Sequence, residues 1–73
     1  MTKPNDQPRH RDMDEELRLL VLERAKTINA SILSQLSTVA TDLDAGANLA
    51  ALGGLDGLDK RIAALRSLLL LLP

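Results

Sequence analysis

Apolar side chains recur at alternating steps of three and four residues through the middle of the chain. The positions in this series are Leu22, Ala25, Ile32, Leu36, Val39 and Leu43, with Asn29 in the one remaining place. Such spacing is typical of a helix that packs lengthwise against another helix. Because Asp12 is suited to cap a helix and no Gly or Pro follows it before Gly46, the pattern predicts one long helix over about residues 12–44.

A second helix is predicted after a glycine-rich connection over about residues 45–57, where the chain reverses direction. The glycines that interrupt the pattern are Gly46, Gly53, Gly54 and Gly57. Asn48 is expected to cap one extra turn within the connection, and Asp56 is expected to cap the second helix over about residues 56–72. The predicted seam of this helix comprises Leu55, Leu58, Ile62, Leu65, Leu69 and Leu72.

Together these elements predict an all-α fold, an antiparallel helical hairpin that forms a single domain over residues 12–73. In this hairpin Leu43 is expected to lie opposite Leu58, and Ile32 opposite Leu69. The long helix then extends well past the short one, since each residue adds about 1.5 Å to a helix. About half of the long helix is therefore expected to lack an intramolecular partner.

This unpaired half is expected over Asp12–Thr27, and the leucine run near the C-terminus lies at the same end of the hairpin. A single core in a chain of 73 residues rarely contributes more than about 3 to 5 kcal/mol. Leaving the apolar side chains at this end in water would cost more than such a fold tolerates. We therefore expect oligomerisation or docking on another protein to complete the fold. The predicted partner-binding residues are Leu17, Leu20, Val21, Leu68, Leu70 and Leu71.

Two of these assignments have a purely structural alternative. The leucine run can be ordinary core at the end of a helix, because Leu69 and Leu72 are seam positions. A polar side chain in a seam, such as Asn29, can set the register by pairing with its counterpart in another helix. Alternatively, a local rotation of the long helix turns Asn29 outward and Ile28 inward.

Residues 1–11 are predicted to form a flexible polar tail. They contain Pro4 and Pro8 and almost no apolar side chain, so they cannot bury enough surface to offset the entropy lost on ordering. No apolar run follows the early charges in the way that a secretory signal requires. A cytoplasmic location is expected on this ground.

Composition removes several classes of function from consideration. The chain has no Cys and one His, and no residues at the spacing of a catalytic or metal site, so we expect no enzyme, cofactor or metal. It has no aromatic residue and no concentrated basic stripe, so nucleic-acid binding is not expected. The run Leu68–Leu72 is much shorter than the about 20 apolar residues of a membrane span.

Three functional hypotheses remain. The first is a non-catalytic protein–protein interaction module, a small accessory or regulatory subunit that docks on a larger protein through its leucine-rich end. The second is a self-contained homodimer, in effect a four-helix bundle of the kind found among chaperones, antitoxins and adaptors. The third is a peripheral membrane-surface helix, for which three cations near the C-terminus and no Trp or Phe make a weak anchor.

Overall fold

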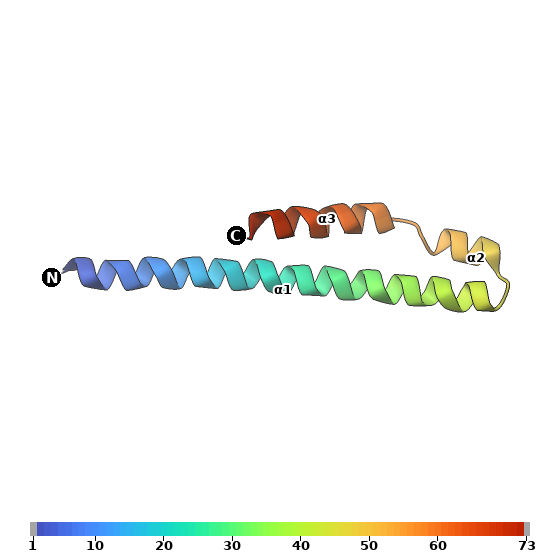
Figure 1. Ribbon diagram of the computed structural model, residues 1–73, viewed down its shortest axis with the longest axis horizontal. Coiled ribbons are helices and arrows are strands. Elements are labelled where there is room, and N and C mark those ends of the chain that lie inside the picture. Colours follow the sequence, from blue (N-terminus) through green and yellow to red (C-terminus); the bar gives the residue numbers. More distant parts are fainter. Residues whose placement is uncertain (1, 73) are drawn as a thin grey trace.

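The computed structural model describes the backbone of residues 2–72 and the side chains of residues 14–72. Its helices are α1 (Thr2–Asp44), α2 (Asn48–Gly53) and α3 (Leu58–Leu71). α1 runs along the full length of the molecule, while α2 and α3 fold back beside its C-terminal part (Figure 1). The predicted all-α antiparallel hairpin is confirmed, and the backbone from residue 2 to residue 72 contains no strand.

α1 begins at Thr2 rather than at Asp12, so Asp12 lies inside the helix and does not cap it. Pro4 falls in the first turn, where a backbone N–H has no acceptor within the helix, so the missing donor does not interrupt it. The side chains before Asp14 lie outside the described part of the structure, as do Met1 and Pro73. The flexible polar tail over residues 1–11 stays a prediction.

α1 ends in a Schellman turn at Gly46. The N–H of Ala47 donates to the carbonyl of Asp42 at 2.8 Å, and the N–H of Gly46 donates to the carbonyl of Leu43 at 3.0 Å. Gly46 has a φ of 74°, a left-handed conformation that glycine adopts without steric cost. Because this turn leaves Ala47 at the N-cap of α2, Asn48 is the first helical residue, and the predicted Asn48 cap is wrong.

A second left-handed glycine, Gly57, stands directly before α3 with a φ of 77°. Its carbonyl accepts the N–H of Arg61 at 3.1 Å, which closes the first turn of α3. Asp56 therefore precedes the N-cap position, and the prediction that Asp56 caps this helix is wrong. The left-handed turn at Gly57 is the reason, because it makes Gly57 the N-cap of α3 and leaves Asp56 in the connection.

The contact face of α1 is rotated from the predicted seam. Its buried residues are Ala25, Ile32 and Val39, each seven residues from the next. The half-buried residues beside them are Val21, Leu22, Ile28, Ser31, Gln35 and Asp42. The seam thus uses Ile28 and Gln35 instead of Asn29 and Leu36, and Leu36 is 41% exposed. Asn29, Leu36 and Leu43 were predicted in the seam, and for all three the prediction is wrong.

α3 is rotated in the same sense. Its half-buried residues are Leu58, Leu65 and Leu68, followed by Leu72 at its C-cap. Three positions predicted in the seam are instead exposed, namely Leu55, Ile62 and Leu69. Beside this rotated seam, Arg61 of α3 hydrogen-bonds to Gln35 of α1.

The register of the hairpin is set by α2, which occupies the end of α1 where α3 was expected. Ala51 of α2 is buried, and Gly54 lies so close to Val39 that an added Cβ would come within 3.0 Å of Val39 Cγ2. α3 is consequently displaced toward the N-terminus of α1. The predicted pairs Leu43–Leu58 and Ile32–Leu69 are wrong for this reason.

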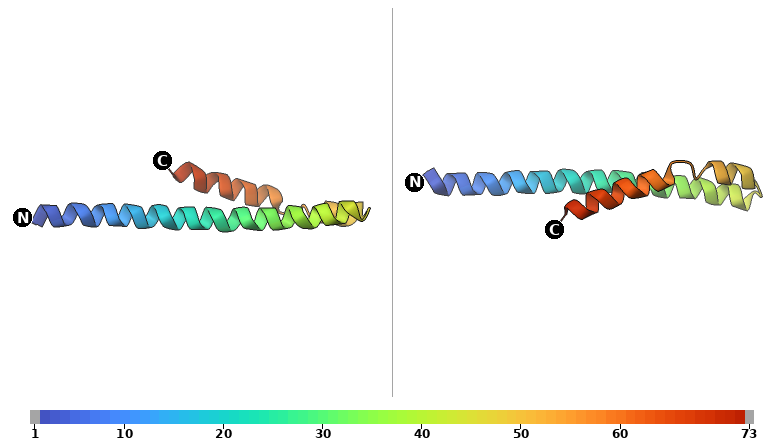
Figure 2. Two further views of the ribbon diagram at one scale, coloured as in Figure 1. Left: turned by 60° about the horizontal axis from the view of Figure 1, so that its bottom comes forward. Right: turned by 90° about the horizontal axis from the view of Figure 1, so that it is seen from above.

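The displacement brings the end of α3 beside residues of α1 that were predicted to be unpaired. Leu71 and Leu72 line one surface cavity together with Leu17 and Val21. The part of the segment Asp12–Thr27 whose side chains are described therefore has an intramolecular neighbour. α3 nevertheless diverges from α1 toward its C-terminus, as both views in Figure 2 show. The two helices do not bury the leucine run between them.

Candidate protein interface

The hairpin is too thin to enclose a substantial core. It measures 69 × 16 × 13 Å, and its radius of gyration of 19.2 Å far exceeds the about 11 Å of a compact chain of this length. The described core consists of Ala25, Ile32, Val39 and Ala51. Large apolar side chains remain exposed on all three helices and in the connection before α3: Leu17, Leu19, Leu20, Leu33, Leu36, Leu43, Leu49, Leu52, Leu55, Ile62, Leu69, Leu70 and Leu71.

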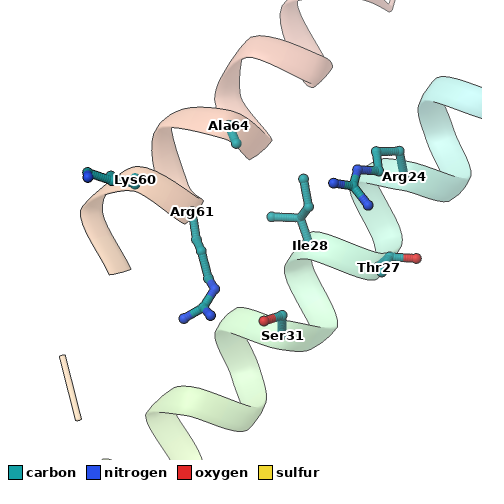
Figure 3. A pocket seen from close by; sticks show the side chains of 7 residues that line it. All are labelled: Arg24, Thr27, Ile28, Ser31, Lys60, Arg61 and Ala64. Carbon is teal, nitrogen blue, oxygen red and sulfur yellow. The ribbon is translucent and has the colours of Figure 1, made fainter. Parts of the chain in front are cut away.

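The two flanks of the hairpin differ in chemistry, and the first is polar. Arg24 and Ser31 of α1 lie seven residues apart and, with Ala64 of α3, line a surface cavity of about 350 Å³. In Figure 3, Arg61 extends toward α1, whereas Lys60 points away from the cavity. We call this side the polar flank. Its cavity is bordered by the exposed cations Arg24, Lys60 and Arg61.

The opposite flank is apolar. Its residues on α1 are Leu22, Asn29, Leu36 and Leu43, and its residues on α3 are Ile62 and Leu69. Within each helix these positions are seven residues apart. Each directly follows a residue that lies in or beside the seam. In an antiparallel pair of helices, the residues one position after the seam residues of each helix project to the same side of the pair. We call this set the leucine flank.

Further apolar residues extend the leucine flank at its edges. Ile62 and Leu69 line a cavity of about 330 Å³ on α3, together with Leu65, Arg66 and Leu70. On α1, Leu33 lies beside Leu36 and is 61% exposed. The flank is thus a broad apolar surface that follows the long axis of the hairpin.

The six predicted partner-binding residues are distributed over three surface cavities and one half-buried position. Leu17, Val21 and Leu71 line a common cavity of about 280 Å³ between α1 and the end of α3. Leu20 instead lines a cavity on α1 with Glu16, Leu19 and Glu23. Leu70 borders the cavity on α3, and Leu68 is half-buried against α1.

Asn29 is exposed, while Ile28 is half-buried in the seam. The local rotation of the long helix that was left open as an alternative is therefore what the structure contains. Asn29 occupies the leucine flank, with Leu22 one heptad before it and Leu36 one heptad after it. A register-setting role for Asn29 in contact with another chain stays a prediction.

Gln35 is the residue that the sequence pattern did not single out. Its side-chain amide donates to the carbonyl of Gly54 at 2.7 Å and to the carbonyl of Asp56 at 3.0 Å. Its side-chain oxygen accepts a hydrogen bond from Arg61. One side chain therefore ties α1 to both the connection and α3. The available signal was its place seven residues before Asp42 and seven after Ile28, in the column beside the predicted seam.

The ionisable side chains form no concentrated site in the described part of the chain. Apart from half-buried Asp42, those from Asp14 onward are exposed, and the one ion pair among them joins Lys26 to Glu23 at 3.2 Å. No group of three or more potential metal ligands occurs among these residues. The helices, as far as they are described, include none with the length and hydropathy needed to cross a membrane.

Comparison with known proteins adds no relative. The chain matches no protein-family model, and neither the curated proteins nor the solved structures yielded a significant match.

Proposed function

We propose that the chain is a non-catalytic protein-interaction module, a small accessory or regulatory subunit that acts by docking on another protein chain. The observation that carries the proposal is the distribution of apolar side chains. Two alanines, one valine and one isoleucine are buried, whereas thirteen larger apolar side chains are exposed in the described part of the hairpin. Large contiguous apolar surfaces on small proteins mark interaction sites.

The energetic argument favours association strongly. Burying one leucine or isoleucine side chain contributes about 1.5 to 3 kcal/mol, and the total stability of a folded domain is about 5 to 15 kcal/mol. A partner that covers only a few residues of the leucine flank therefore contributes as much as the chain's own fold. Association with another chain is therefore expected to stabilise the hairpin substantially.

The distribution of charge supports a non-catalytic role. Acid–base and nucleophilic catalysis uses ionisable groups that are held close together in a partly enclosed site. In this hairpin the described ionisable groups are spread along the exposed faces of two thin helices. The cavity on the polar flank is bordered by Arg24, Lys60 and Arg61, with no acidic group or other base among its lining residues.

The proposal is tested by the stability of the purified full chain as a function of its concentration. Helicity and urea unfolding are followed by far-UV circular dichroism from low to high micromolar protein. We expect either a midpoint that rises with concentration or a weakly helical chain that needs another protein. A monomer that unfolds cooperatively at the same midpoint throughout would show that the apolar surface needs no partner, and the proposal would be abandoned.

A further inference from the structure

We infer that the leucine flank is the contact surface of a two-fold symmetric homodimer, whose axis crosses the hairpin at the level of Asn29 and Ile62. This inference rests on the proposed interaction function and names the first partner as a second copy of the chain. Three features support it: the exposed area of the chain, the symmetry of the leucine flank, and the charges at its edge under the same axis.

The exposed area fits a dimer. The chain exposes 5984 Å², whereas a compact monomer of its mass exposes about 4,400 Å². A standard protein interface buries about 800 Å² on each partner. This is about half of the exposed area by which the chain exceeds a compact monomer. The remainder includes the projecting N-terminal part of α1, which α3 does not cover (Figure 1).

The flank is self-complementary about one level of the hairpin. Ile28 and Arg61 line the same cavity, so their neighbours Asn29 and Ile62 lie at about the same height along the two helices. A two-fold axis at this height lies in the contact plane, perpendicular to the helices. It packs α1 antiparallel against α1 of the second copy, and α3 antiparallel against α3 of the second copy. Leu22 then faces Leu36 of the second copy, because both are seven residues from Asn29.

The same axis brings α3 against α3 of the second copy. Ile62 meets its own counterpart there, and Leu69 follows one heptad later on the same side of α3. Self-pairing of Asn29 on α1 and of Ile62 on α3 at one height is what a two-fold axis requires, and a surface for an unrelated partner does not require it.

Charge complementarity is the third feature. Asp59 and Arg66 lie on the outer edge of the leucine flank, three residues before and four residues after Ile62. Under the same axis, Asp59 of each copy lies opposite Arg66 of the other. Both side chains are exposed in the single hairpin and form no ion pair there, since Lys26–Glu23 is the one pair among the side chains described. The dimer gives each a partner of opposite sign.

At the axis, Asn29 faces Asn29 of the second copy. Asn side chains both donate and accept, so two copies satisfy each other within an otherwise apolar contact. A polar residue in this position favours the register in which the two amides meet, at some cost in stability. This gives Asn29 its predicted register-setting role in the contact between chains, although it is absent from the seam within the hairpin.

Cross-linking tests the axis directly, because the chain has no native cysteine. The full chain carrying Asn29→Cys is oxidised at micromolar concentration and compared with Thr38→Cys, a matched exposed position on α1 outside the leucine flank. We expect Asn29→Cys to form a covalent dimer at least about tenfold faster, since a disulfide needs Cα atoms within about 7 Å. Equal rates would overturn the inference.

Charge exchange tests the register by a second route. Asp59→Arg and Arg66→Asp are each expected to raise the dissociation constant of the dimer about tenfold, because each creates two like-charge contacts. The double variant is expected to recover most of the affinity. Lys60→Asp is the control, since it makes the same charge change as Arg66→Asp outside the leucine flank. A double variant as weak as either single one would contradict the pairing.

Light scattering on size-exclusion fractions gives the mass of the native chain, which is expected near twice 7.9 kDa. A mass of one chain at about 100 µM would overturn the dimer, since such contacts normally bind at micromolar or better. The unfolding experiment described above separates the two claims. A weakly helical monomer contradicts the dimer alone, whereas a stable monomer with a concentration-independent midpoint contradicts the interaction function as well.

Discussion

Gln35 of α1 and Arg61 of α3 are hydrogen-bonded across the hairpin, beside the seam where the two helices meet. The Gln35 amide also holds the carbonyls of Gly54 and Asp56, so α1 is joined to the connection and to α3 at one point. Leu36 and Ile62, which directly follow Gln35 and Arg61 in the sequence, are exposed on the leucine flank. The side chain that joins the helices is thus polar, and the exposed side chains next to it are apolar.

Replacement of Gln35 with Ala is expected to lower the free energy of unfolding by about 1 to 3 kcal/mol, since it removes three hydrogen bonds of which one involves a charged group. Urea unfolding at a fixed protein concentration measures the change. Ser37→Ala is the matched control, because Ser37 is an exposed residue of the same helix. An unchanged midpoint for Gln35→Ala would show that Gln35 does not hold the connection in place.

Gly54 and Gly53 are expected to respond oppositely to Ala. A Cβ on Gly54 would lie 3.0 Å from Val39 Cγ2 and 3.3 Å from the carbonyl oxygen of Ala51, whereas a Cβ on Gly53 meets nothing within 4 Å. Valine is stiff in a helix and cannot easily move aside. Gly54→Ala should therefore lower stability by about 1 to 2 kcal/mol, and Gly53→Ala should leave it unchanged or raise it by up to about 1 kcal/mol. Thermal unfolding compares the two variants, and equal losses would contradict the close approach at Gly54.

Gly57 is expected to resist replacement because of its backbone conformation. Its φ of 77° costs an L-residue about 1 to 2 kcal/mol, although no atom would obstruct a Cβ there. Gly57→Ala should be less stable than Gly57→Asn, because Asn tolerates the left-handed conformation better than Ala does. Urea unfolding of both variants measures the difference. A fully tolerated Gly57→Ala would indicate a different entry into α3.

The leucines near the C-terminus are expected to differ in their contributions to folding. Leu68 is half-buried against α1, whereas Leu70 is 77% exposed. Truncation of Leu68 to Ala should lower stability by about 1 to 2 kcal/mol, while truncation of Leu70 should change it by less than about 0.5 kcal/mol. Circular dichroism at one protein concentration provides the comparison. Equal losses of stability for the two variants would contradict the difference in burial between Leu68 and Leu70.

Much of the fold could be predicted from the pattern of Gly and apolar residues. The glycines at 46, 53, 54 and 57 marked the reversal of the chain, and two of them do adopt left-handed conformations. The three-four spacing marked helices that pair lengthwise. The caps were predicted less well: Asp12, Asn48 and Asp56 were assigned from residue type alone, and the turns at Gly46 and Gly57 displaced the latter two from the cap positions.

The face of each helix could not be read in the same way. The predicted column of α1 is the more apolar one, since it contains Leu22, Leu36 and Leu43, whereas the adjacent column ends in Gln35 and Asp42. The predicted column contained Asn29 and Leu36, and the observed one contains Ile28 and Gln35. A polar Gln35 is not expected in a seam from the sequence alone. Two of its hydrogen-bond partners are main-chain carbonyls, and a sequence does not show which main-chain groups a side chain will meet.

The sequence by itself determined that the chain is a helical hairpin with more apolar surface than it can bury, because periodicity and glycine placement are local properties. Only the tertiary structure decided where that surface lies. The connection packs closely against Val39 at Gly54, so α3 is displaced along α1, and Gln35 joins α1 to the connection and to α3 by hydrogen bonds. Both effects depend on contacts between residues distant in the chain, so the leucine flank emerges only when the helices are brought together.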